Sequence, residues 1–264
     1  MPTHNSSKSL AASVESILGQ TYQDLELLIT DDCSTDATRD MLKSYAAKDP
    51  RVKVELLTEH GGPAVARNKS IERASGRYIA FCDSDDRWLP EKLEEQLRHM
   101  DDHDCALCSS SYLICNENGG VIGVNYSPSH LTLRDMRRDN KIGCLTAIYD
   151  TKRLGQKYYM PNIRKRQDWA LFLNILKDCQ ICYCVKEPLA LYSHHSKGSV
   201  SSDKMSLIKY NVNIYETVFD YSRFKSWLLF LFLFLPTYSF KKLKVKYDSR
   251  RFLKEHSGTP ITNH

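Results

Sequence analysis

The residues best suited to chemistry form a short acidic run, Asp83-Ser84-Asp85-Asp86. The run follows an apolar stretch, Tyr78–Cys82, that predicts a buried strand, and Pro90 then opens a helical pattern. Three carboxylates within four residues repel one another, so such a run is typical of a site that holds a hard divalent cation. In an extended segment, Asp83 and Asp85 point to the same side. A solvated strand-to-helix turn with an aspartate N-cap would explain the same residues.

A second acidic pair, Asp31-Asp32, ends another apolar run over residues 25–30, and a third apolar run covers residues 52–57. Helical patterns separate these runs, and one of them begins after Gly61-Gly62-Pro63. Strands that alternate with helices through short connections predict an α/β fold with a Rossmann-like, mostly parallel central sheet flanked by helices. Because ligands bind beyond the carboxyl ends of such strands, we expect both acidic groups to face one crevice.

The middle of the chain is less regular and predicts a small second β-element. Its expected parts are a strand over residues 105–115, a hairpin return over 121–124, a short helix over 132–139, and strands over 143–149, 181–185 and 189–192. A helix with a buried face begins near Trp169. No repeat or linker divides this part of the chain, so we predict one domain over residues 1–202.

The remaining residues, 203–264, predict a C-terminal helical tail. Its apolar stretch, Trp227–Leu235, is shorter than the roughly 20 residues that cross a bilayer. Lysines and arginines crowd the sequence after Pro236, and an apolar face beside such a cluster favours a segment lying on an anionic membrane surface. A C-terminal helix packed on the domain would explain the apolar stretch equally well.

Composition limits the class of protein and its compartment. The 264 residues contain 37 Lys+Arg against 32 Asp+Glu, so no global basic excess indicates a nucleic-acid partner. Nine cysteines and the lack of a signal-peptide pattern favour the cytosol. The spacings Cys105-x-x-Cys108 and Cys179-x-x-Cys182-x-Cys184 occur in zinc sites, but their apolar surroundings favour buried thiols.

Five segments occur in an order that resembles the family 2 glycosyltransferases, inverting enzymes of the GT-A fold that use nucleotide-activated sugars. The segments are Pro2-Thr-His-Asn5, Leu28-Ile-Thr-Asp-Asp-Cys-Ser-Thr-Asp36, Gly62-Pro-Ala-Val-Ala-Arg-Asn68, Gly76-Arg-Tyr-Ile-Ala-Phe-Cys-Asp-Ser-Asp-Asp86 and Gln167-Asp168-Trp169. The resemblance covers residues 1 to about 205. It is greatest to enzymes that extend bacterial surface polysaccharides such as O-antigen, capsule or teichuronic-acid-like chains.

The resemblance implies a nucleotide-binding group of five residues. Thr3 and Asn5 belong to the loop that lines the base pocket, and Asp32 matches the acceptor of a uracil-type ring N–H. Arg67 matches a cation beside the diphosphate, and Asp83 faces the ribose or the water shell of the metal. As a residue at a helix N-terminus, Asp32 has a purely structural alternative, and Arg67 has one as a surface residue of an amphipathic helix.

The resemblance also implies a metal, Mn²⁺ or Mg²⁺, and a catalytic base. Asp85 is expected to ligate the metal directly, with His195 as a third contact to metal or diphosphate. Asp168 matches the general base that deprotonates the acceptor hydroxyl, although Gln167 replaces the glutamate that usually precedes it. The basic residues 164–166 could clamp a phosphate or form a solvated loop.

The implied activity is sugar transfer from a nucleotide sugar, with UDP favoured by Asp32, to a glycan or polyprenyl-diphosphate-linked acceptor. It would take place on the inner face of the bacterial cytoplasmic membrane. A non-catalytic nucleotide-sugar-binding protein of the same fold is the alternative. A sugar-1-phosphate nucleotidyltransferase would carry a glycine-rich basic loop, which residues 1–9 do not supply. The strand that precedes the Pro-Thr-x-Asn turn in the family is absent here, which predicts exposed ladder groups and apolar surface.

Overall fold

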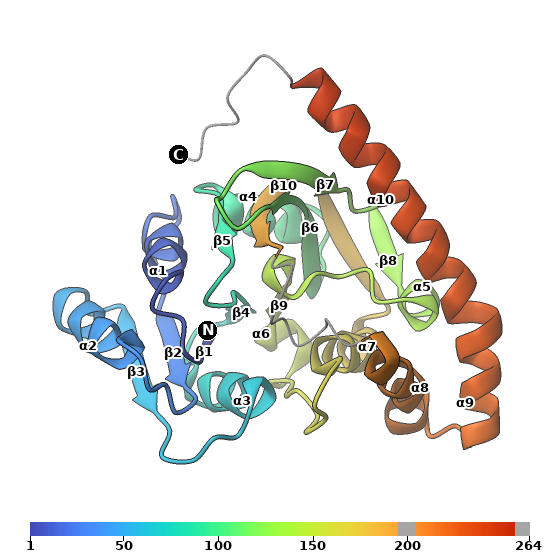
Figure 1. Ribbon diagram of the computed structural model, residues 1–264, viewed down its shortest axis with the longest axis horizontal. Helices are drawn as coiled ribbons and strands as arrows, with labels where there is room; N and C mark the ends of the chain where they lie inside the picture. The colour runs from blue at the N-terminus through green and yellow to red at the C-terminus, as the bar shows by residue number, and fades with distance from the viewer. Residues whose placement is uncertain (195–203, 257–264) are drawn as a thin grey trace.

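A computed structural model describes residues 1–194 and 204–256, without the side chains of residues 204–206 (Figure 1). The strands are β1 (Pro2–Thr3), β2 (Leu27–Asp31), β3 (Val52–Leu56), β4 (Tyr78–Ala80), β5 (Arg87–Trp88), β6 (Leu107–Cys115), β7 (Val121–Asn125), β8 (His130–Thr132), β9 (Ile148–Asp150) and β10 (Ile181–Ser193). The helices are α1 (Leu10–Leu18), α2 (Thr38–Lys48), α3 (Pro63–Arg73), α4 (Lys92–Asp102), α5 (Leu133–Arg138), α6 (Thr151–Leu154), α7 (Gln167–Cys179), α8 (Lys204–Phe219), α9 (Arg223–Leu229) and α10 (Leu235–Glu255). A 3₁₀ turn, η1 (Cys144–Thr146), and a π-helical turn, η2 (Phe230–Phe234), complete the described elements.

The strands form two sheets flanked by helices, which confirms the predicted α/β class, but the expected mostly parallel pairing holds only in the first sheet. The first has the order β1-β2-β3 and is entirely parallel. The second has the order β4-β9-β6-β10-β5, with β7 added to β6 and β8 to β10. Within it only β6 and β10 run parallel, so the sheet as a whole is mixed. The predicted hairpin return is confirmed as β7.

Three local predictions change in the structure. The two strands expected over residues 181–185 and 189–192 are one strand, β10, whose register shifts on either side of Pro188. The strand expected over residues 143–149 divides into η1 and β9. The aspartate N-cap alternative is wrong, because β5 separates the acidic run from α4, whose N-cap is Glu91. The acidic run is therefore a turn that does not cap a helix.

The C-terminal helices pack on the core around α7. Trp169 is fully buried, and its ring lies 5.5 Å from Phe234 of η2 and 6.2 Å from Tyr215 of α8. From there α10 runs as one long helix along the flank of the molecule (Figure 1). No helix in residues 1–194 or 204–256 is long and apolar enough to cross a membrane. The predicted domain boundary after residue 202 falls outside the described residues and stays a prediction.

The segment Pro2–Thr3, which the sequence predicted as part of a turn, is a short strand, β1, beside a cavity between the two sheets. Only Pro2 and Thr3 of β1 pair with β2, and the chain start lies between β2 and β4 (Figure 1). A cavity of about 690 Å³ occupies this space, lined by residues of β2 and β4 that include Leu28 and Ile79. The Met1 ammonium group lies at the cavity and donates a hydrogen bond of 2.7 Å to the Leu28 carbonyl.

Candidate active site

The acidic run forms a tight turn, here called the acidic loop (Asp83–Asp86), just after β4. Two serines of the N-terminal segment hold it: Ser6 Oγ lies 2.7 Å from Ser84 Oγ, and Ser9 Oγ donates to the Ser84 carbonyl at 2.8 Å. From the end of β10, Ser193 donates its hydroxyl to the Asp85 carbonyl. Segments about 80 and 110 residues away in sequence therefore fix this loop, so its shape is preorganised.

The carboxylates of the acidic loop are electrostatically crowded. Asp86 is buried, and its Oδ1 accepts a hydrogen bond of 3.0 Å from the Ser193 amide. Burial raises the pKa of Asp86 well above its usual value, and the charges of Asp83 and Asp85 raise it further. Asp86 thus anchors the loop to β10, while the other two carboxylates supply the negative charge that a bound cation would neutralise.

Arg67 pairs directly with the acidic loop. Its Nη2 lies 2.6 Å from Asp83 Oδ1, and its Nη1 contacts Met160 Sδ at 3.9 Å. Burial lowers the pKa of Arg67, but the charge and hydrogen bond of Asp83, together with the charges of Cys144 and Asp168, raise it by more. The pKa therefore lies above its usual value, and the guanidinium remains charged.

Asp32 closes the loop that leads into α3. Its two carboxylate oxygens accept hydrogen bonds from the Gly61 amide at 2.7 Å and the Gly62 amide at 2.8 Å. Gly62 has a φ of 84°, a left-handed conformation that glycine adopts without strain. His60 Nδ1 lies 2.9 Å from Asp32 Oδ2, so the carboxylate has three partners.

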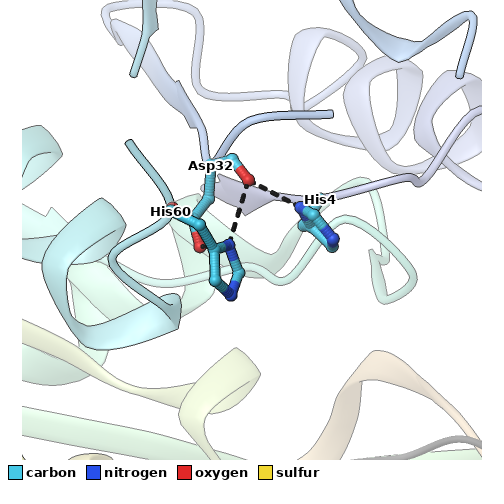
Figure 2. Close-up of side chains that lie close together, drawn as sticks. All are labelled: His4, Asp32 and His60. Atoms are coloured by element: carbon cyan, nitrogen blue, oxygen red, sulfur yellow. Dashed lines mark hydrogen bonds and ion pairs between the residues drawn. The ribbon is translucent and has the colours of Figure 1, made fainter. Parts of the chain in front are cut away.

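Figure 2 shows His4 and His60 close together around Asp32. Their rings lie 4.9 Å apart, and His4 Nδ1 is 2.6 Å from the Asp32 carbonyl. Ligand atoms of the three residues lie within 4.8 Å of one another, a spacing open to a metal ion. Because Asp32 Oδ2 and both histidine Nδ1 atoms already have hydrogen-bonding partners, we interpret the trio as a hydrogen-bonded cluster. Neither histidine was predicted as a site residue. The one sequence feature that indicates such a role is the position of His60 directly before two glycines.

The two predicted residues of the first loop, Thr3 and Asn5, differ in their side-chain contacts. Thr3 is buried, and its hydroxyl has no hydrogen-bonding partner in the described part of the chain. Asn5 has a φ of 49° and ties its loop to the one after β2, because its Oδ1 accepts a hydrogen bond of 2.8 Å from the Thr35 amide. The Asn5 amide donates to Ser34 Oγ at 2.8 Å. Their predicted contacts with a nucleotide stay predictions.

Asp168 lies in the first turn of α7 and is held from outside that helix. Asn140 Nδ2 donates a hydrogen bond of 2.9 Å to Asp168 Oδ2. The preceding N-cap residue, Arg166, has a φ of 68° and donates from Nε to Asn211 Oδ1 at 2.8 Å. Gln167 donates to the Arg164 carbonyl at 3.1 Å, so the residue that departs from the family pattern supports the basic loop. No pattern in the sequence predicted the contact between Asn140 and Asp168.

Three further predictions concern His195, the basic loop over residues 164–166 and the cysteines. His195 lies outside the described residues. In the basic loop, Lys165 lies 6.0 Å from the Tyr210 ring and Arg166 contacts Asn211, so both turn toward α8. The thiols of Cys108 and Cys184 are buried in β6 and β10, where Ser109 Oγ donates to Cys184 Sγ at 3.1 Å.

An α/β sheet with a fixed acidic loop at the end of a strand, beside a buried arginine and a helix-borne aspartate, defines a glycosyltransferase of the GT-A fold. The chain belongs to glycosyl transferase family 2, whose family model matches residues 1–157.

Comparisons with individual proteins agree with this assignment. The chain is 41% identical over 218 residues to a Bacillus subtilis (strain 168) protein assigned to teichuronic acid biosynthesis, glycosyltransferase TuaG, covering 82% of this chain and 86% of that protein. It is 37% identical over 210 residues to the Escherichia coli UDP-Glc:alpha-D-GlcNAc-diphosphoundecaprenol beta-1,3-glucosyltransferase WfgD, covering 79% and 81%.

Solved structures share the fold. The crystal structure of S. aureus TarS 1-349 in complex with UDP-GlcNAc superimposes with a TM-score of 0.65 at 22% identity, covering 85% of this chain and 67% of that one. Mannosyltransferase PcManGT from Pyrobaculum calidifontis, in complex with GDP-Man and Mn²⁺, gives a TM-score of 0.60 at 18% identity, covering 84% and 63%.

Proposed function

We propose that this glycosyltransferase moves a sugar from a UDP-sugar to a polyprenyl-diphosphate-linked acceptor by a metal-dependent, inverting displacement. One observation carries the proposal: the buried Arg67 forms an ion pair of 2.6 Å with Asp83 of the acidic loop. A cation beside a diphosphate, carboxylates for a metal and a base for an acceptor hydroxyl are the three requirements of this reaction. The name of WfgD describes glucosyl transfer from UDP-Glc to a diphosphoundecaprenol-linked sugar, and that of TuaG describes a glycosyltransferase of teichuronic acid biosynthesis.

Asp32 supports a uracil-containing donor. Its two carboxylate oxygens offer about four acceptor positions, and three are used by the Gly61 amide, the Gly62 amide and His60. The position that remains suits the ring N–H of uracil or thymine. Cytosine has no such ring N–H, and guanine carries its N1–H on a larger purine ring. A pyrimidine with a ring N–H therefore favours a UDP-sugar, as in the donor named for WfgD.

The acidic loop fits a hard divalent cation. Mg²⁺ and Mn²⁺ bind through one or two carboxylates together with substrate phosphates, and Asp85 with the half-exposed Asp83 provides these oxygen donors. The raised pKa of Asp86, caused by burial and then by its two acidic neighbours, shows how much negative charge is concentrated there. When bound, such an ion would neutralise the charge that builds on the departing diphosphate.

The residues of the chain have separate roles in the displacement. Asp168 accepts the proton of the acceptor hydroxyl as that oxygen attacks the anomeric carbon, while the bond to the diphosphate breaks. Arg67 holds positive charge beside the leaving diphosphate. With one base and no matching second carboxylate nucleophile, a single displacement inverts the anomeric centre. Asn140 occupies Asp168 Oδ2, which leaves Oδ1 for the acceptor.

A lipid-linked acceptor places the reaction at a membrane surface, and the tail (residues 203–264) fits this location. Phe232, Phe240 and Leu243 are 76%, 71% and 67% exposed, on the same η2–α10 segment that carries the lysines. Apolar side chains beside basic residues bind the interface of an anionic leaflet. We therefore propose peripheral attachment to the inner face of the cytoplasmic membrane through η2 and α10.

A nucleotide screen by calorimetry tests the proposal. We expect UDP and TDP to bind in the presence of Mn²⁺ at least about tenfold more tightly than GDP or CDP. Asp32→Asn should abolish this preference, while Asp40→Asn, a matched change at an exposed carboxylate of α2, should keep it. Equal binding of all four nucleotides to the parent chain would contradict the role of Asp32.

The non-catalytic alternative makes a different prediction for turnover. A binding protein of this fold would bind UDP with metal but would not consume UDP-glucose or UDP-N-acetylglucosamine. Release of UDP from either donor in the presence of an N-acetylglucosaminyl diphosphate lipid, measured with the parent chain, would exclude the alternative. Binding without any release would favour it.

A further inference from the structure

A buried acidic residue on the far side of Asp168 has a partner from α10. Asp139 follows the last residue of α5 and is 2% exposed. Lys241 of α10 reaches it across about 100 residues of sequence, with Nζ 2.5 Å from Asp139 Oδ2. Burial raises the pKa of Asp139, and Lys241 opposes this rise. Without the lysine, a charged Asp139 would have little compensation in this position.

The same lysine reaches the residue that holds Asp168. Lys241 Nζ donates a hydrogen bond of 2.7 Å to the Asn140 carbonyl, and Asn140 Nδ2 donates one of 2.9 Å to Asp168 Oδ2. Two consecutive hydrogen bonds therefore connect α10 to Asp168, and the ion pair with Asp139 holds the lysine at the start of this path. A lysine that only covered the surface would not bind both the side chain of one residue and the carbonyl of the next.

The neighbouring contacts hold the two ends of this connection in place. Trp169, directly after Asp168, donates from Nε1 to the Met136 carbonyl of α5 at 2.7 Å, and its ring packs on Phe234. Farther along α10, Ser249 Oγ accepts a hydrogen bond of 3.0 Å from the Val124 amide of β7. Lys241 lies between these two anchored points, so its position relative to Asn140 is fixed by packing at both ends.

We propose that Lys241, with Asp139 and Asn140, positions Asp168, so that the helix proposed to bind the membrane also completes the active site. The inference rests on the proposed role of Asp168 as base. Lys241 and Asp139 touch no reacting atom in this account; they act through Asn140 on the orientation of the carboxylate. Because the chemical step is sensitive to placement at the ångström scale, loss of the support should lower kcat more than it affects donor binding.

Two variants of the full chain separate positioning from charge. Lys241→Met removes the support, and Lys246→Met removes one exposed charge from the same helix as a matched control. We expect Lys241→Met to lower kcat by about tenfold or more, with KM for UDP-glucose within about twofold of the parent. Lys246→Met should match the parent, and Lys241→Arg should recover part of the loss. The acceptor is a detergent-dispersed N-acetylglucosaminyl diphosphate lipid, which removes membrane binding from the readout.

A coupling test uses Asn140→Ala. If Lys241 acts through Asn140, the double variant should be no slower than Asn140→Ala alone, because both changes interrupt one connection. Independent, multiplicative losses would contradict the inference, and so would equal losses in Lys241→Met and Lys246→Met. Asp168→Asn serves as the reference. If it turns over like the parent, the proposed base is wrong; if it is inactive while Lys241→Met turns over like the parent, only the present inference fails.

Hydrogen exchange provides a readout that needs no turnover. Amides of residues 170–173, the first of α7 that bond within the helix, should lose protection in Lys241→Met and keep it in Lys246→Met, since only the first change frees the segment around Asn140. Unchanged protection in Lys241→Met would overturn the inference even if no donor were consumed. A melting temperature measured for each variant shows whether a loss of protection is local.

Discussion

At the residue scale, neighbouring carboxylates of the acidic loop have different surroundings and therefore different roles. Asp83 forms an ion pair with the buried Arg67, whereas Asp86 is buried against the Ser193 amide. The sequence placed all three acids at the end of a strand, but it could not separate them by environment. That separation depends on β10 and α3, which reach the loop from positions far away in the chain.

The Arg67–Asp83 pair predicts a measurable loss of stability. Asp83→Asn removes the charge that compensates a buried guanidinium, so the free energy of unfolding should fall by about 2 kcal/mol. This figure lies below that for a fully buried pair because the Asp83 side chain is 32% exposed. Urea unfolding without metal measures it. A midpoint equal to that of Asp40→Asn would contradict the pairing, and Arg67→Met combined with Asp83→Asn should recover part of the loss.

At the element scale, strands β2 and β3 and the helices α2 and α3 were predictable because apolar periodicity and glycine or proline boundaries act locally. β10 was not, since Pro188 interrupts its pattern while parallel pairing with β6 continues through register shifts on both sides. The apolar stretch Trp227–Leu235 packs on the domain with one face, because Phe230 and Phe234 are buried, whereas Phe232 is exposed. Packing on the domain is thus confirmed for that face, and the membrane contact of the other face stays a prediction.

The exposed side of η2 and α10 predicts lipid binding. Replacing Phe240 and Leu243 with serine should weaken binding to phosphatidylglycerol vesicles by about tenfold per side chain, because each loses the free energy of burying apolar surface. Co-flotation with vesicles measures this binding. Tyr159→Ser changes a side chain that is 46% exposed outside the tail and should bind like the parent. Equal binding of all variants would exclude this side of α10 as the attachment surface.

At the scale of the whole molecule, the two sheets meet around a cavity of about 690 Å³ lined by Met1 and by residues of β2 and β4. The sequence indicated the strands on either side of this cavity. It could not predict that the Met1 ammonium group would lie against the Leu28 carbonyl. A charge in that position carries a desolvation cost, which makes the junction of the sheets sensitive to pH.

The stability of the chain should therefore rise with pH across the neutral range. Burial lowers the pKa of the Met1 ammonium group to about 6 from an unfolded value of 8.0. Between these values the unfolded chain binds the proton and the folded chain does not, so raising the pH favours folding, by up to about 2 kcal/mol. Urea unfolding at pH 6 and pH 8 measures the slope. An N-terminally acetylated chain should lose this part of it; an identical slope would contradict the assignment.

The central claim is that Asp168 removes the proton of the acceptor hydroxyl, and one kinetic comparison tests it most directly. Turnover of UDP-glucose with Mn²⁺ and the detergent-dispersed N-acetylglucosaminyl diphosphate lipid is measured for the parent, Asp168→Asn and Asp40→Asn. We expect Asp168→Asn to lower kcat by about a hundredfold or more, while the dissociation constant for UDP, measured by calorimetry, stays within about twofold of the parent value. A kcat for Asp168→Asn equal to that of Asp40→Asn, with UDP binding intact, would contradict the claim.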